Sequence, residues 1–515
     1  MGFKETCQGF PPARFVMAFM AFTGYINVYI VRNNINLAIV AMVNYTAIRE
    51  EVNPSNDSLI PEEKQCEFQT VNSTDTSEDG PFPWSEPIQA LISTSFLWGY
   101  FITNIPGGRL AEIFGTKYLL AISQILASAL TMLIPIAASV GWELIIVIRV
   151  TMGLVQGPSF PCMHPLLAKW IPPQERGTIS AVVYAGQQLG TVVGLLLTGL
   201  IINKLGWEAV FYIEGCIGFV WTFFWLLLVF DSPDTHPRIS KAEKKYIRTS
   251  IANDASPTKK VASVPWKDIF TSLPFYAILI ANIGHNWGFL ILLTELPIYM
   301  KNILGFDIKS NSMATAFPYF LTWLASIAVS PLADLCKQKE WLSTVWIRKI
   351  FTLIGHMGPA VCLTAVAFAG CDLTLILVML TLSVSLQAGI YAGWFINHID
   401  IASNFAGTLF GLTNGLSIIP SWIGPLVVGF ITKGNQTIEA WQIVFLLAAV
   451  VLGFDAVFFL IFASGDEQPW NKEATKQTKK EDTRESMKCF DAGTTDTKSE
   501  AQKTAQKDLK CPSTS

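Results

Sequence analysis

Twelve apolar runs of about 20 residues each constrain the fold of this chain more than any other feature. The hydrocarbon core of a bilayer offers no water to exposed backbone groups, so runs of this length are expected to cross it as α-helices. The sequence therefore predicts an all-α polytopic membrane protein, with helices near 15–43, 88–108, 118–140, 143–168, 179–203, 208–230, 275–298, 312–333, 347–370, 373–396, 406–431 and 440–463.

Composition supports this fold class and argues against several functions. Of the 515 residues, 51% are hydrophobic and 15% are charged, whereas ordinary globular chains carry about 25% charged residues. The formal net charge of −3 gives no reason to expect a nucleic-acid partner. The nine cysteines lack metal-ligand or CxxC spacing, so neither a metal site nor a disulfide framework is predicted. The polar segments show no nucleophile–base constellation or glycine-rich nucleotide loop, so we do not expect an enzyme.

The polar segments divide the chain into two six-helix halves. The N-terminal half covers residues 15–230, the C-terminal half covers 271–465, and a Lys-rich linker at 231–270 separates them. Residues 1–14 and 466–515 are expected to be cytosolic, and the charged tail 466–515 is expected to be disordered. N-glycosylation sequons at Asn44, Asn56 and Asn72 predict that the loop 45–87 lies outside the cytosol. The excess of Lys and Arg in the opposite loops predicts the same orientation.

A short motif occurs once in each half. GRLAE at 108–112 is followed by Lys117, and PLAD at 331–334 is followed by Arg348. Each resembles the cytosolic turn after the second helix of a major facilitator half, and makes Glu112 and Asp334 candidate gating acids. The alternative is an ordinary charged loop. The repeat predicts a 12-helix major facilitator fold with two pseudo-symmetric halves, a site near the bilayer midplane, and rocking of one half against the other.

Two arginines lie within apolar helices. Arg32 is in the middle of the first predicted helix and Arg149 is in the fourth. A guanidinium at membrane depth costs at least roughly 2.5–3.5 kcal/mol on insertion scales, so it requires water, a dipole or an anion as its partner. The carboxylate or phosphate of a transported anion can be that partner, and the alternative is a fixed ion pair within the bundle. Gly157, Pro158 and Pro161 follow Arg149 and predict a bend in this helix.

Longer motifs go beyond the superfamily. FPCMHPLLAKWIPPQERGTIS, YAGQQLGTVVG and GWEAVFYIEGCIG lie in the first half, and INHIDIASNFAGTLFGLTNG and FASGDEQPW in the second. They resemble the solute carrier 17 (SLC17) anion:cation symporters, which include sialin, the vesicular glutamate transporters and the sodium/phosphate cotransporters. The resemblance is greatest to sialin and to insect inorganic phosphate cotransporters, and it covers residues 32–470.

This resemblance implies a secondary active transporter in the bilayer. Its solute would be a small anion, either inorganic phosphate or an organic carboxylate, moved by symport with sodium or protons through alternating access. We expect a glycosylated monomer, with no cofactor other than the co-transported cation, in the plasma membrane or in a lysosomal or vesicular membrane. One alternative is a lysosomal or vesicular sialin-like carrier of acidic sugars or amino-acid anions that is coupled to protons. Another is a receptor that binds an anion without moving it.

The resemblance also nominates binding residues. Arg32 matches the first-helix arginine of the family and is assigned to substrate contact. Arg149 matches the fourth-helix arginine, where direct binding and gating both remain open. His285 occupies a seventh-helix position at which the glutamate transporters carry arginine, and it would supply a cation that depends on pH. Tyr184 and Asn414 are uncharged donors that would complete an anion site.

The coupling residues depart from the family pattern. Gln156 stands where sialin and the glutamate transporters carry a glutamate, and an amide cannot take up a proton. This favours sodium coupling, or a proton site moved to His285 or Glu295. Glu295 is expected near the outer interface, where a solvated or gating role is equally open. His164 is a further gating candidate, and it is interpreted mainly as a structural hydrogen-bonding group at the inner gate. The same interpretation applies to Asn397, His398 and Asp400, and packing roles are expected for Trp287 and Trp394.

Overall fold

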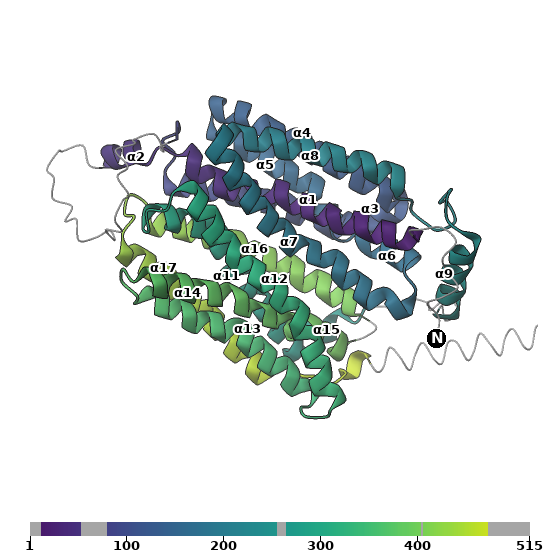
Figure 1. Cartoon of the computed structure of the whole chain (residues 1–515). Helices are drawn as coiled ribbons and strands as arrows, with labels where there is room; N and C mark the ends of the chain where they lie inside the picture. The colour runs from purple at the N-terminus through teal and green to yellow at the C-terminus, as the bar shows by residue number, and fades with distance from the viewer. Residues whose placement is uncertain (1–11, 53–79, 255–263, 403–404, 472–515) are drawn as a thin grey trace, which may run out of the picture.

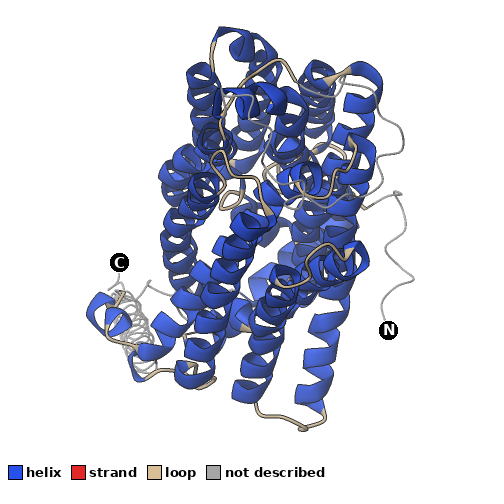
Figure 2. Ribbon diagram, turned by 90° about the vertical axis from the view of Figure 1, so that its left-hand side faces the viewer, coloured by secondary structure: helices blue, strands red, loops and turns tan. Residues whose placement is uncertain are grey.

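The computed structural model describes residues 12–52, 80–254, 264–402 and 405–471. These ranges consist of helices and the loops that join them, with one isolated bridge between Val43 and Phe82 and no strand (Figure 2). The N-terminal half contains α1 (Ala13–Met42), α2 (Tyr45–Val52), α3 (Glu86–Phe114), α4 (Thr116–Val140), α5 (Trp142–Gln156), η3 (Gly157–Ser159), α6 (Met163–Trp170), α7 (Pro173–Leu205) and α8 (Trp207–Leu228). The linker contains α9 (Lys241–Asp254) and α10 (Trp266–Phe270). The C-terminal half contains α11 (Leu273–Asn302), α12 (Ile308–Gln338), α13 (Thr344–Ala367), α14 (Leu373–Leu386), η4 (Gln387–Tyr391), α15 (Trp394–Ile401), α16 (Ala406–Ile431) and α17 (Ile438–Phe462).

These helices confirm the predicted twelve-span fold. Ten segments within the described residues are long and apolar enough to cross a membrane. The other two expected spans are α3, which carries the first copy of the charged motif, and the fourth span, which is divided between α5 and α6. Local sequence explains several helix ends: the Asp372 side chain accepts from the backbone N–H of Leu375, and Gly115, at φ +80°, allows α4 to follow α3 after a single residue.

The fourth and tenth spans are broken at matching places. In the N-terminal half, α5 passes through η3 before α6 resumes, and in the C-terminal half α14 passes through η4 before α15. The sequence predicts the first bend, because Gly157, Pro158 and Pro161 disfavour a regular helix. It gives no comparable proline signal in the tenth span, where tight packing of Gly389 against the backbone of Phe351 accompanies the break.

The two ends of the bundle differ in what covers them. Figure 1 shows α2 at one end and α9 at the other, and we call these the outer and inner ends after the predicted topology. At the inner end, the Glu243 carboxylate of α9 accepts from the backbone N–H groups of Ala13 and Arg14 at 3.0 and 3.1 Å. A carboxylate at a helix N-terminus is favourable. The linker is therefore docked under α1 rather than being only a connection.

The outer end joins the two halves through a shared apolar core. This core includes buried residues from both halves, such as Ile39 and Phe96 from the first and Leu296 and Trp441 from the second. Hydrogen bonds also cross between the halves here, because the Glu86 carboxylate accepts from the Gly434 backbone and the Gln436 amide at 3.3 and 3.4 Å.

The inner ends of the halves have separate cores instead. One core contains Met17, Trp170 and Trp225 of the N-terminal half with Ile247 of α9, and the other contains Phe275 and Trp394 of the C-terminal half. The described structure is thus closed at the outer end and divided at the inner end.

Two expectations about boundaries and crosslinks need correction. Trp470 is buried in the inner core of the C-terminal half, so the folded chain extends past the boundary predicted at residue 466. Burial of this large apolar ring favours a folded segment beyond residue 466. Residues 472–515 lie outside the described residues. Cys371, at the outer end, is disulfide-bonded, although the cysteine spacing predicted no disulfide framework.

The predicted glycosylation sites are only partly within the described chain. Asn44 is half-buried, and its side-chain oxygen accepts from the Ala47 backbone at 2.8 Å, which caps α2. Asn56 and Asn72 lie outside the described residues. Glycosylation of this loop stays a prediction.

Candidate functional site

Arg32 lies within an aromatic cage formed by α1 and α3. Its guanidinium carbon is 4.8 Å from the Phe96 ring centroid, 4.9 Å from that of Tyr100 and 5.3 Å from that of Tyr29. Ring faces attract a cation, and the attraction strengthens where water is excluded. A guanidinium has five N–H donors in a planar fork, so Arg32 can lie among the rings and still donate to an anion.

Arg149 is fixed directly beside Arg32. Its side chain is only 2% exposed, and Nη1 donates to the carbonyl oxygen of Arg32 at 3.1 Å while Nη2 approaches the Ser93 carbonyl at 3.4 Å. The guanidinium carbon is 5.3 Å from the Phe96 ring, so this ring contacts both cations. Gly153 allows α5 to pack closely enough on α3 for these contacts, because a Cβ there would lie 2.0 Å from the Phe96 carbonyl oxygen.

Neither arginine has an acidic partner in the part of the chain that the structure describes. The ion pairs found there involve Arg14, Lys244, Arg248, Arg348 and His356. The Nε of Arg149 is buried and has no hydrogen-bond partner among the described residues. Two adjacent guanidinium groups without an acidic partner among the described residues, one of them half-buried and the other buried, create a strong preference for an anion. The alternative prediction of a fixed ion pair within the bundle is therefore wrong for the described residues.

Amide and hydroxyl groups extend this site toward the other half. Tyr29 donates to the Gln187 side chain of α7 at 3.0 Å, and Gln188 donates to the Tyr391 hydroxyl of η4 at 2.8 Å. The second bond crosses between the halves near mid-depth. The cage around Arg32 is thus connected through α7 to the break in the tenth span.

Gln156 lies at the matching break of the fourth span. Its side chain is buried, and neither its amide nitrogen nor its oxygen has a hydrogen-bond partner among the described residues. Gln387, at the break of the tenth span, is buried and unpartnered in the same way. Each half therefore presents one uncharged amide where its helix is interrupted, and a primary amide can donate to an anion or accept from a cation's hydration shell.

Tyr184 and Asn414 are not placed beside the two arginines. Tyr184 packs against Tyr25 and Phe160, with centroid distances of 5.4 and 5.2 Å, and Tyr25 lies two helical turns nearer the inner end than Arg32. Asn414 is half-buried on α16, where its backbone carbonyl accepts from Ser417. Substrate contact by either residue stays a prediction.

His285 belongs to a cluster in the C-terminal half. Its ring is half-exposed and lies 5.8, 5.9 and 6.0 Å from the rings of Phe289, Trp394 and His356. None of these contacts reaches Arg32 or Arg149, so the predicted third cation of the anion site stays a prediction. Trp394 does more than the packing expected of it, because its Nε1 donates to Nε2 of His356 at 3.2 Å.

Glu295 is buried in the shared outer core. Its side chain is 5% exposed and accepts from the Thr294 hydroxyl at 3.1 Å. The sequence placed it near a solvated outer interface. Closure of the outer end explains the difference, because α11 is covered there by helices of both halves.

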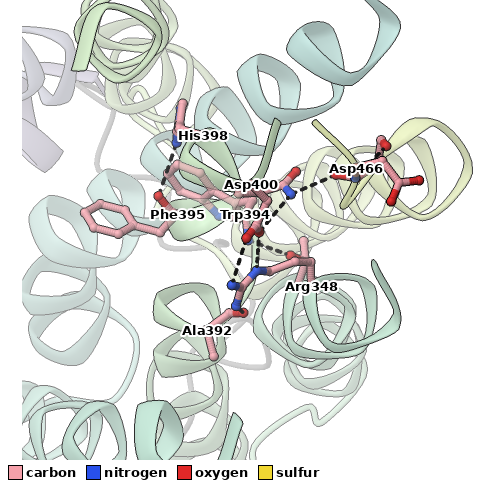
Figure 3. Close-up of polar contacts among 10 residues, drawn as sticks. Arg348, Ala392, Trp394, Phe395, His398, Asp400 and Asp466 are labelled. Atoms are coloured by element: carbon pink, nitrogen blue, oxygen red, sulfur yellow. Dashed lines mark hydrogen bonds and ion pairs between the residues drawn. The ribbon is translucent and has the colours of Figure 1, made fainter. Parts of the chain in front are cut away.

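A polar network ties α13 to α15 at the inner end. Arg348 donates from Nε to the Asp400 carboxylate at 2.6 Å, and Asn397 bonds both Asp400 and the Ser464 carbonyl (Figure 3). His398 bonds the Thr413 hydroxyl and lies near the Phe395 carbonyl. These contacts remain within the C-terminal half and fit the structural roles predicted for Asn397, His398 and Asp400.

The predicted gating acids do not form this network. Asp334 is exposed on α12, and the acid that pairs with Arg348 is Asp400, which the motif alone did not indicate. The side chains of Glu112 and His164 lie outside the described residues. Among the described residues, no group of three or more His, Cys, Asp and Glu side chains is placed to hold a metal ion.

Comparison with known proteins agrees with this architecture. The family model of the Major Facilitator Superfamily matches residues 16–421. A protein named "Putative inorganic phosphate cotransporter" from Drosophila ananassae is 40% identical over 467 residues, which cover 89% of this chain and 94% of that protein. Human sialin is 41% identical over 458 residues (89% and 90%), and human vesicular glutamate transporter 2 is 34% identical over 477 residues (92% and 78%).

Solved structures show the same fold at low identity. A bacterial homolog of the human lysosomal transporter Spinster matches with a TM-score of 0.65 at 14% identity, covering 90% of this chain and all of that one. A D-xylose–proton symporter matches with a TM-score of 0.59 at 15% identity, covering 88% and 99%. The chain is therefore a multi-pass membrane protein that belongs to the major facilitator superfamily and, within it, to the SLC17 family of sialin, the phosphate cotransporters and the vesicular glutamate transporters.

Proposed function

We propose that this protein is not an enzyme but a carrier that moves a small anion across its membrane by alternating access. The observation that carries the proposal is the adjacent pair of Arg32, in its aromatic cage, and the buried Arg149, neither of which has an acidic partner among the described residues. An anion bound there would accept charge-assisted hydrogen bonds from two guanidinium forks. The division of the inner ends provides its route toward the cytosol.

The class of anion is small and oxygen-rich. A planar guanidinium suits both phosphate and carboxylate, because each offers two oxygens at the spacing of the fork. Relatives whose names refer to phosphate and to glutamate support both chemistries. We therefore propose inorganic phosphate or an organic carboxylate as the solute, moved together with a cation that offsets its charge.

Flux into proteoliposomes tests this proposal. The purified full-length protein would be reconstituted, and uptake of labelled phosphate, glutamate and sialic acid would be measured under sodium, proton and potential gradients imposed one at a time. We expect uptake of at least one of these anions above protein-free vesicles. Saturable binding without flux under every gradient would instead establish the anion-binding receptor.

A further inference from the structure

A buried histidine–aspartate pair lies in the C-terminal half, away from the two arginines. His356 of α13 is 0% exposed and Asp455 of α17 is 1% exposed, with 2.8 Å between Nδ1 and Oδ1. An ionisable group inside an apolar helix is expensive and usually serves a purpose. The proposed anion site makes no use of either residue.

The hydrogen bonds define where the protons are. An indole N–H can only donate, so Nε2 of His356 must accept from Trp394 and carries no proton. The proton of the neutral imidazole is then on Nδ1 and is donated to the Asp455 carboxylate. The other carboxylate oxygen, Oδ2, is buried with no hydrogen-bond partner among the described residues. In this arrangement the pair carries one negative charge.

The protein makes specific space for this carboxylate. A Cβ on Gly284 of α11 would lie 1.5 Å from Oδ2 of Asp455, so only glycine fits there. The connection between η4 and α15, which we call the elbow, is also packed closely on α13. Here the Trp394 backbone N–H donates to the hydroxyl of Thr352, one helical turn before His356, at 2.9 Å. The pair is therefore packed closely between α11 on one side and the connection from η4 to α15 on the other.

The elbow connects the pair to the anion site. Tyr391 at the end of η4 accepts from Gln188, and the neighbouring Gln187 accepts from Tyr29, which is part of the Arg32 cage. Trp394 follows Tyr391 by three residues. A movement of one half relative to the other that breaks the Gln188 contact would therefore also act on the indole that bonds His356.

His285 of α11 lies beside the pair, in ring contact with both His356 and Trp394. Its half-exposed ring is nearly parallel to the His356 ring, with centroids 6.0 Å apart and planes 8° apart. The sequences of α14 and α16 contain no titratable side chain. The other titratable or charged side chains on the elements around the pair lie on α11 (Tyr276, Glu295, Tyr299 and Lys301), α12 (Lys309, Tyr319, Asp334, Cys336 and Lys337), α13 (Arg348, Lys349 and Cys362), η4 (Tyr391), α15 (His398 and Asp400) and α17 (Glu439).

We propose that His356 and Asp455 form the proton-binding site that couples this carrier, and that Trp394 controls when the proton is held. The proposal rests on the carrier function proposed above. In the outer-open state, Trp394 withdraws, Nε2 accepts a proton through its free lone pair, and an imidazolium–carboxylate pair of zero net charge forms. When the inner end opens, the indole N–H reoccupies Nε2, and the proton leaves past His285 into the inner space. Proton and anion then move in the same direction.

The test separates accumulation from exchange in proteoliposomes. Wild type, Asp455→Asn and Glu214→Gln would be compared, with labelled phosphate, or the anion that wild type carries best, as the probe. Glu214 is a matched control, because it is also buried and its carboxylate accepts from Thr198 at 2.8 Å, but it lies in the other half. Uptake driven by an acid exterior measures coupling, and exchange at equal pH measures anion movement alone.

We expect proton-driven accumulation by Asp455→Asn to be at least about tenfold lower than by wild type. Exchange should continue, because anion binding by the arginines does not require the pair. Glu214→Gln should retain both activities. Accumulation at the wild-type level in Asp455→Asn, or loss of exchange together with accumulation, would overturn the proposal. Wild-type accumulation that ignores the proton gradient would overturn it too, whereas absence of any wild-type flux would refute the carrier function itself.

Trp394→Phe provides a second variant that retains the ring and removes only the N–H donor. Without this donor, no N–H competes with the proton for Nε2 of His356, so His356 holds its proton up to a higher pH. We expect the pH midpoint of accumulation to move upward by about one unit, which corresponds to the loss of roughly one hydrogen bond. An unchanged midpoint in a folded Trp394→Phe protein would exclude the indole as the switch.

Discussion

The polar groups of the two halves differ in kind. In the N-terminal half, Arg32 and Arg149 lie side by side around the Phe96 ring, and neither has an acidic partner among the described residues. In the C-terminal half, His356 and Asp455 are paired and can gain or lose a proton. An arginine is charged at every physiological pH, whereas an imidazole is not. The difference suggests a division of labour, in which one half holds the anion and the other carries the proton.

Removal of the caged cation should have the largest effect. Arg32→Ala is expected to reduce anion uptake by at least about 100-fold, because it removes the charge-assisted hydrogen bonds proposed to hold the anion. Arg32→Lys should restore little, since an ammonium cannot reproduce the planar fork. Uptake normalised to protein in the membrane measures the effect. Uptake by Arg32→Ala close to wild type would remove this residue from the site.

Displacement of the Asp455 carboxylate should test the role proposed for the C-terminal half. In Gly284→Ala the new methyl group meets Oδ2 of Asp455, so we expect proton-driven accumulation to fall by about tenfold and the melting temperature to drop, since overpacking costs typically 1–3 kcal/mol. Gly453→Ala is the control, because no atom lies within 4 Å of its added Cβ. Equal behaviour of the two alanine variants would contradict the described packing.

Removal of the Phe96 ring, which contacts both arginines, should have an intermediate effect. Phe96→Leu retains apolar volume but removes two cation–π contacts, so we expect the apparent anion affinity to weaken by about three- to tenfold at every pH. Phe211→Leu, which changes a buried phenylalanine in the same shared core, should leave the affinity unchanged. An effect of Phe96→Leu that appears only at acidic pH would break the proposed division between the halves.

His285→Gln should have the smallest effect. A neutral amide keeps the volume of the ring roughly but cannot relay a proton, so we expect proton-driven uptake to slow by about twofold while exchange is unchanged. Initial rates measured against external pH and sodium provide the readout. Strong acid stimulation that disappears completely in His285→Gln would make this residue, rather than His356 and Asp455, the proton carrier.

Sequence alone predicts much of the fold and one half of the site. The twelve spans follow from apolar length, and Arg32 and Arg149 are conspicuous because each is a single cation in an apolar run. His356 and Asp455 carry the same signal, as ionisable residues within the ninth and twelfth spans, and the same rule could have nominated them. Their pairing could not be predicted, because they are 99 residues apart in the chain and meet only when α13 packs on α17.

Other features depend on the conformation as well as on the fold. Glu295 was expected near solvent because it lies toward the outer end of its helix, but closure of that end buries it. The motif made Asp334 a candidate gating acid, whereas the acid that pairs with Arg348 in the folded chain is Asp400 of the tenth span. Sequence patterns place residues along a helix, but the partner of each residue is set by which helices touch.

Equilibrium binding tests the division of labour most directly. Binding of labelled phosphate, or of the anion that wild type carries best, would be measured on detergent-purified wild type, Arg32→Ala and His356→Gln at pH 5.5 and pH 7.5. Our account predicts tighter binding by wild type at the lower pH, no measurable binding by Arg32→Ala at either pH, and binding by His356→Gln that no longer changes with pH. Binding by His356→Gln that retains the full wild-type pH dependence would contradict the account.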